Sequence, residues 1–326
     1  MTSSLKISRR TAMAGAGAAV LALHAGPSLA QVKGLELIVP ANPGGGWDQT
    51  SRAMQEVLQA NDLASGVQVT NIGGAGGTIG LAQFVTTKKG RGNAILTGGL
   101  VMLGAILTNK APVTLDNVTP LARLTGEYEA LVVPADSPVK SLGDVVAKLK
   151  ADPGSVSWGG GSAGGTDHIV AALIAKAAGV DPTKVNYIAH AGGGEALSSI
   201  LGGHVTVGVS GYQEFAAQIA AGKLRGIALI AENRLPGVDI PTAREQGIDV
   251  ALINWRAIFA PPGIKPADMK TLSDMVAKMV KTPQWQETLK KRDWIDMYLP
   301  ADEFAVFLKN DSAQIETTLK GLGLVT

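Results

Sequence analysis

One glycine-rich loop carries the strongest catalytic signals in this sequence of 326 residues. Gly160-x-Ser162-x-Gly164 matches the turn that presents the nucleophile of serine hydrolases. The overlapping pattern Gly159-x-Gly161-x-x-Gly164 matches the phosphate-binding turn of dinucleotide-binding proteins. Each match lies between a predicted strand and a predicted helix, which is the context that both kinds of chemistry need.

The rest of the chain completes neither enzyme. A hydrolase of this kind needs a histidine after its nucleophile, normally near the C-terminus, yet no histidine follows His204. A dinucleotide site needs an acid that ends a second strand about 20 residues on, whereas Asp181 precedes a proline in a predicted loop. The histidines lack metal-ligand spacing and the chain has no cysteine. We expect no catalytic residue, no metal and no cofactor, with a serine hydrolase using Ser162 kept as the alternative.

The glycine-rich loop is one of four that follow a predicted strand and precede a predicted helix. The strands are 35–40, 67–71, 156–158 and 185–188, and the helices begin near residues 49, 79, 168 and 196. This order predicts an α/β fold with parallel strands and crossover helices. The loops then lie at the carboxyl ends of strands, where such sheets bind ligands. Glycine lets an anion reach the backbone N–H groups and the positive helix ends there, so the 41 glycines predict an anion-binding crevice.

Side chains in and beside these loops add few charges. The loops hold no lysine or arginine, and Arg52 is the nearest, one helical turn away. Asp48, at a helix start, is expected to cap that helix, to order the loop or to pair with a ligand amine. Trp47 is expected either in the pocket wall or in the core. His168 is expected either to contact a ligand or to form a structural hydrogen bond.

Residues 1–30 predict an export signal. Lys6, Arg9 and Arg10 precede a short apolar stretch and the small residues Ser28 and Ala30 of a cleavage site. The arginine pair suggests the Tat route, with Sec left open. Its removal changes the formal net charge from +2 to −1, and no later run is long enough to span a membrane. We therefore expect a soluble periplasmic protein with no nucleic-acid partner.

Motifs along the whole exported chain resemble one family, the extracytoplasmic receptors of tripartite tricarboxylate transporters, also called Bug-type receptors. Ala41 and the sequence Ile188-Ala189-His190 depart from the usual family pattern, which makes the identity of the ligand open. The matching motifs are PGGGWD at 43–48 followed by Arg52, NIGGAGGTIG at 71–80, Gly161-Ser162 with His168, Gly202-Gly203, Arg234 and Pro236 with Pro241-Thr242, Glu245 and Gly247, and Trp255 before Phe259-Ala260-Pro261.

The resemblance implies a two-lobed Venus flytrap of the periplasmic-binding-protein type (type II), each lobe a mainly parallel sheet flanked by helices. Lobe 1 is predicted from residues 31–128 and 254–326, and lobe 2 from 129–253. The implied function is capture of a small tri- or dicarboxylate or related organic acid, without catalysis, for a transporter with one large and one small membrane subunit. We expect a monomer. A receptor of the same fold that serves a signalling partner is the other alternative.

The resemblance also implies the ligand site. Family members hold a ligand carboxylate through the first two glycine loops, partly through water, and the later loops supply the opposite side. The predicted ligand-binding residues are Asn42, Gly44, Gly45, Gly46, Trp47, Asp48, Gly76, Gly77, Thr78, Thr97, Ser162, Thr166, His190, Gly193 and Gly194.

Overall fold

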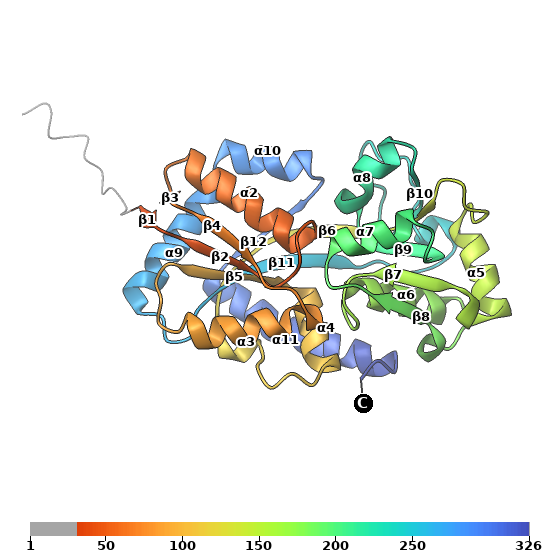
Figure 1. The fold of residues 1–326 in the computed structure, drawn as a ribbon, viewed down its shortest axis with the longest axis horizontal. Helices are drawn as coiled ribbons and strands as arrows, with labels where there is room; N and C mark the ends of the chain where they lie inside the picture. The colour runs from red at the N-terminus through yellow and green to blue at the C-terminus, as the bar shows by residue number, and fades with distance from the viewer. Residues whose placement is uncertain (1–30, 326) are drawn as a thin grey trace, which may run out of the picture. The chain divides into compact units, whose positions relative to one another are not determined.

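The computed structural model describes residues 31–325, and residues 32–326 form one compact unit (Figure 1). The predicted export signal, residues 1–30, lies outside the described residues. No helix in the described part combines the length and the apolar character needed to cross a membrane.

A mixed sheet of ten strands forms the centre of this unit (Figure 1). Two further short strands, β1 (Val32–Lys33) and β3 (Ala64–Ser65), form a parallel pair. In spatial order the main strands are β4 (Gln68–Asn71), β2 (Glu36–Val39), β5 (Ala94–Gly99), β11 (Ile253–Ala260), β6 (Thr119–Pro134), β9 (Val207–Gly211), β7 (Ser157–Gly160) and β8 (Asn186–Ala189), with β10 (Leu224–Leu229) and β12 (Ile295–Pro300) also paired to β6.

Strand direction divides this sheet into three parts. The strands β4, β2 and β5 are parallel at one end, and β9, β7 and β8 are parallel at the other. Between them β11 and β6 run antiparallel to their neighbours. The first part of β6 pairs with β11 and β12, and its last part pairs with β9 and β10. The long strand β6 therefore joins the two parallel ends.

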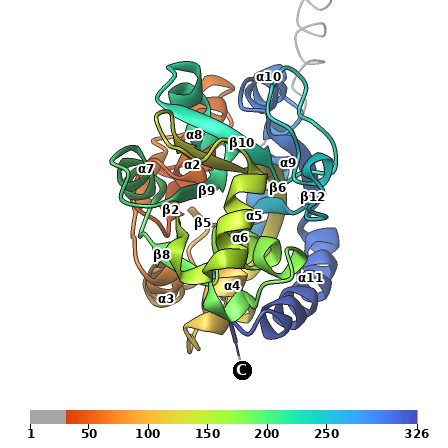
Figure 2. The same ribbon diagram turned by 90° about the vertical axis from the view of Figure 1, so that its right-hand side faces the viewer.

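Helices cover both faces of the sheet at each end (Figures 1 and 2). Short 3₁₀ turns occur at Ala75–Gly77, Leu115–Asn117, Pro153–Ser155, Pro182–Lys184 and Arg244–Gln246. The helices are α2 (Gly46–Ala60), α3 (Thr78–Thr87), α4 (Leu100–Thr108), α5 (Leu142–Ala151), α6 (Thr166–Ala177), α7 (Gly193–Leu201), α8 (Tyr212–Ala220), α9 (Pro266–Met279), α10 (Pro283–Lys291) and α11 (Ala301–Gly321).

Four buried clusters hold these layers together. At the β4–β2–β5 end, one cluster packs α2, α9 and α10 on the sheet, and a second packs α3, α4 and α11 on the other face. At the β9–β7–β8 end, α5 and α6 cover one face and α7 and α8 the other. Alternation along β6 serves both clusters at this end, because Leu131 and Val133 face one and Ala130 and Val132 face the other.

The predicted strand–loop–helix order is confirmed at all four glycine loops, which connect β2 to α2, β4 to α3, β7 to α6 and β8 to α7. Ser141 begins α5 with a capping box that includes Asp144, as its sequence suggests. Two further strand–helix connections were not predicted: β5 to α4 and β9 to α8. The antiparallel centre was not predicted either, since it depends on pairing between strands far apart in the sequence.

Candidate functional site

A cavity with about 600 Å³ of empty space lies at the carboxyl ends of β2, β7, β8 and β9. Two surfaces of different chemistry line it. The first, here called the loop wall, consists of Gly45, Gly46, Gly161, Gly192 and Gly193 with the neighbouring Trp47, Ser162 and His190. The second, called the charged wall, consists of Asp167, Ser210, Glu214, Asn254 and Arg256.

In the loop wall, glycine loops from the two ends of the sheet touch each other. A Cβ atom on Gly45 would lie 3.2 Å from the backbone nitrogen of Gly193. Nearby, Asn42 Nδ2 donates to Glu195 Oε1 at 2.5 Å, and the Asn42 N–H donates to the carbonyl of Ala191 at 3.5 Å. Approach this close leaves no room for side chains on Gly45 and Gly193.

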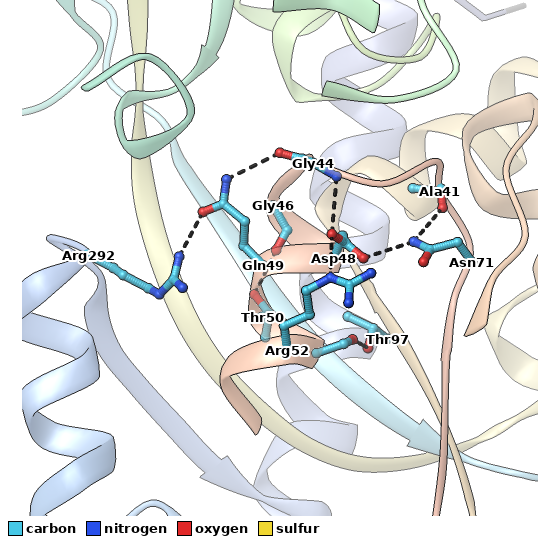
Figure 3. Close-up of polar contacts among 11 residues, drawn as sticks. Ala41, Gly44, Gly46, Asp48, Gln49, Thr50, Arg52, Asn71, Thr97 and Arg292 are labelled. Atoms are coloured by element: carbon cyan, nitrogen blue, oxygen red, sulfur yellow. Dashed lines mark hydrogen bonds and ion pairs between the residues drawn. The ribbon is translucent and has the colours of Figure 1, made fainter. Parts of the chain in front are cut away.

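The carboxylate of Asp48 orders the first of these loops (Figure 3). Its Oδ2 accepts from the Gly44 N–H at 3.1 Å and from Arg52 Nε at 2.9 Å, and its Oδ1 accepts from Asn71 Nδ2 at 3.0 Å. Burial raises the pKa of Asp48, but the hydrogen bonds from Arg52, Asn71 and Gly44 outweigh burial and hold this pKa below its usual value. Among its three predicted roles, the structure therefore supports ordering of the loop, and Asp48 does not line the cavity.

A buried ion pair forms the base of the charged wall. Arg256 on β11 contacts Glu127 on β6 through Nη2 and Oε1, and both side chains are only 3% exposed. The Arg256 guanidinium lies 3.7 Å from Glu214 Oε1 and 5.4 Å from the ring centre of Trp294. Burial lowers the pKa of Arg256 to about 9, so the guanidinium remains a cation at neutral pH.

Three more buried carboxyl groups surround this pair. Burial, followed by the charge of Asp167, raises the pKa of Glu214 to about 8. Burial also raises the pKa of Asp167 to about 6, although Asp167 Oδ2 accepts from the Gly161 N–H at 2.6 Å. Behind them, the completely buried Glu129 accepts from Asn254 Nδ2 at 2.9 Å and hydrogen-bonds to Asp167. Burial and the neighbouring acids raise the pKa of Glu129 well above its usual value.

The loop amides, which the sequence predicts to be available for an anion, are largely occupied by the chain's own carboxylates. Four backbone N–H groups donate in this way, two of them from residues of the cavity lining. The pairs are Gly44 with Asp48, Gly46 with Glu214, Gly161 with Asp167, and Ala191 with Glu195. The predicted crevice of free amides is therefore corrected: at these positions the acids of the protein satisfy the amides.

Two glycines also leave space for charged side chains from the opposite wall. A Cβ atom on Gly46 would overlap the guanidinium of Arg256, and one on Gly193 would overlap the carboxyl group of Glu214. Glycine at these positions thus allows the charged wall to pack directly on the loop backbone.

Six of the predicted site residues line the cavity: Gly45, Gly46, Trp47, Ser162, His190 and Gly193. Trp47 fills both of its predicted roles, because it also packs in the core cluster around α3 and α4. Gly76 lines a smaller pocket that shares Ser162 and His190 with the main cavity.

The other predicted site residues support the site from outside the cavity lining. Asn42, Gly44, Asp48 and Gly194 lie in the two touching loops. Gly77 and Thr78 begin α3, where Thr78 Oγ1 donates to the carbonyl of Ala75 at 2.9 Å. Thr97 is completely buried and shares a hydrogen bond of 2.7 Å with Ser51. Thr166 is completely buried too, and its Oγ1 has no hydrogen-bond partner among residues 31–325.

The histidines near Ser162 do not form a catalytic pair with it. His168 accepts from the Gly164 N–H at 3.1 Å and stacks on Tyr187, with ring centres 4.3 Å apart. Burial lowers its pKa to about 4. His190 Nδ1 lies 2.9 Å from the carbonyl of Gly160. Within residues 31–325 neither ring hydrogen-bonds to the hydroxyl of Ser162, so this geometry does not activate the serine.

The charged wall is what sequence reasoning missed. Glu127, Glu129 and Arg256 lie within strands whose other residues are mostly buried, and a charge inside an apolar strand pattern is a signal that could have found them. Asp167 stands directly beside the predicted Thr166. For Glu214, in the first turn of an ordinary amphipathic helix, the sequence carries no distinguishing signal.

Comparisons with known proteins agree with the fold. The UPF0065 protein in the gbd 5′ region of Cupriavidus necator is 28% identical over 318 residues, which is 95% of each chain. The structure of R. palustris Rpa4515 with adipate superposes with a TM-score of 0.80 at 20% identity, over 89% of this chain and 97% of that one. MatC (Rpa3494) from Rhodopseudomonas palustris with bound malate gives 0.75 at 22% identity, over 90% and 99%.

These likenesses confirm the predicted α/β fold of the periplasmic-binding-protein class. The model of the tripartite tricarboxylate transporter family receptor matches residues 50–324, which include most of both cavity walls. The chain therefore belongs to the receptor family of tripartite tricarboxylate transporters.

Proposed function

We propose that this protein captures a small organic acid in the cavity and delivers it to a membrane transporter. The observation that carries this proposal is the position of the cavity, where glycine loops from both ends of the sheet meet a buried charged wall. Two solved structures with this fold hold dicarboxylates, adipate and malate. We assign no catalytic role to the chain, because the family consists of receptors and Ser162 has no histidine partner among the described residues.

The two ends of the sheet act in this proposal as two lobes, residues 31–128 with 254–326, and residues 129–253. They close on the ligand by bending at β6 and β11, the strands that connect them. The closed form, with its glycine loops in contact, is the form that the transporter recognises. The partners are one large and one small membrane subunit, and the receptor acts as a monomer in the periplasm after residues 1–30 direct its export.

A titration of the purified protein tests this function. Isothermal titration and thermal shift with adipate, malate and citrate-like acids should find at least one tight binder that raises the melting temperature. Gly45→Val should abolish this binding, because its side chain would separate the touching loops. Gly143→Val, at an exposed position in α5, is the control and should bind normally.

The outcome against the proposal is equally definite. If no organic acid in a broad panel binds or stabilises a folded protein, transport of organic acids by this receptor is rejected. If acids bind equally well to the wild type and to Gly45→Val, the function survives but the site lies elsewhere.

A further inference from the structure

The charged wall carries more negative groups than its single cation can balance. Glu127, Glu129, Asp167 and Glu214 surround Arg256, and Arg256 directs its guanidinium to Glu127. Glu214 lies farther away, at 3.7 Å. Asp167 and Glu129 form no ion pair with any basic side chain of residues 31–325. Buried carboxyl groups without a cation are costly when ionised, so this wall can accept one from a ligand.

A second observation shows that the cluster has unmet hydrogen-bonding capacity. Glu127 Oε2 and Glu129 Oε2 are buried and have no hydrogen-bond partner among residues 31–325. The same holds for Thr166 Oγ1, next to Asp167 in the chain. Most buried polar atoms in folded proteins are hydrogen-bonded, so three exceptions in and beside one cluster at a cavity point to a missing donor.

We propose that Asp167 and Glu214 form a subsite for a protonated amine, so that the ligand is a small amino acid rather than a simple di- or tricarboxylate. This inference rests on the proposed function and specifies the ligand class of the same cavity. The ammonium group of the ligand donates to both carboxylates, as a cation in a buried acidic site does.

The loop wall offers a place for the carboxylate of such a ligand. Gly193 lines the cavity and is the first residue of α7, and its N–H has no acceptor among residues 31–325. A Cβ atom at Gly193 would touch Glu214, so the carboxylate and the ammonium sites are adjacent. The N-terminus of α2 is different, because the Gly46 N–H is taken by Glu214 and a second carboxylate there would displace it.

Matched ligand pairs test the inference on the wild-type protein by isothermal titration. Adipate is compared with 2-aminoadipate, and malate with aspartate, because each pair differs chiefly in the amine. We expect at least one amino member to bind about tenfold or more tightly than its partner, the size of a charge-assisted hydrogen bond. Glu214→Gln and Asp167→Asn should each remove most of this preference. Glu245→Gln, which removes an exposed carboxylate, should keep it.

The outcomes separate the two proposals. If plain acids bind as tightly as their amino partners or more tightly, the amine subsite is rejected and the receptor function stands. If neither class binds, the receptor function itself fails. If Glu214→Gln tightens adipate binding and leaves 2-aminoadipate unchanged, Glu214 only blocks the site and the inference is again rejected. Because the wild-type comparison needs no variant, misfolding of a mutant cannot hide the result.

Discussion

The loop wall and the charged wall of the cavity satisfy their polar groups by different means. The loop wall presents backbone N–H groups, and most of its contacts come from residues close in the sequence, such as Gly44 with Asp48. The charged wall presents side chains that meet only after folding, such as Glu127 with Arg256 across 129 positions of the chain. Where the walls meet, Glu214 donates no charge to solvent but accepts from the Gly46 N–H.

This difference shows which wall determines the chemistry of the ligand. Amides of the loop wall suit any anion, yet several of them already serve the protein's own acids. The excess of carboxyl groups in the charged wall is specific to a cationic or proton-donating ligand group. We therefore expect the loop wall to set the shape of the site, and the charged wall to set the preference among ligands.

The largest effect should follow from removing the cation of the charged wall. Arg256→Met leaves Glu127 buried without its partner, and breaking a buried ion pair costs about 3–5 kcal/mol. Urea unfolding should show this loss of unfolding free energy. Arg52→Met is the matched control, because its pair with Asp48 is half exposed on the arginine side and should cost under about 1 kcal/mol. Equal losses in both variants would mean that the charged wall is not a buried network.

A smaller effect is expected where the loop wall touches the charged wall. Gly46→Ala places a Cβ atom on the Arg256 guanidinium, and overpacking of this kind costs roughly 1–3 kcal/mol. Gly143→Ala, in the first turn of α5, should instead be neutral or gain up to about 1 kcal/mol. Thermal unfolding of the two variants measures the contrast. A stable Gly46→Ala protein with normal ligand binding would show that the two walls do not pack as described. Gly76→Ala is not a suitable probe, because Gly76 has φ +63° and its Cβ would overlap Ala105.

The smallest change, for each pH unit, concerns Glu214 in the ligand-free protein. The folded state keeps its proton up to about pH 8, whereas the unfolded chain releases it near the usual pKa of 4.5. Between these values the unfolding free energy should fall as pH rises, by up to about 1.4 kcal/mol per unit from this group. Glu214→Gln should remove that part of the slope. Asp167 and His168 titrate in both proteins, so the difference between the two profiles isolates Glu214; parallel profiles would contradict its raised pKa.

The two walls also differ in how far the sequence predicts them. A run of glycines after an apolar strand is a local signal, so all four loops and the start of each following helix could be predicted. Thr97 and Thr166 lie beside such loops, but the sequence does not tell that their side chains turn into the core. The charged wall combines residues of β6, α6, α8 and β11, and their proximity follows from the antiparallel centre of the sheet. That pairing depends on contacts between distant segments, which no local pattern specifies.

A crystal structure of the complex with the tightest-binding ligand tests the central claim most directly. The account predicts a ligand between the two walls, with a nitrogen about 2.7–3.2 Å from carboxylate oxygens of Asp167 and Glu214 and a carboxylate at the N–H of Gly193. A ligand bound outside this cavity, or one whose polar groups leave Asp167 and Glu214 untouched, would contradict it.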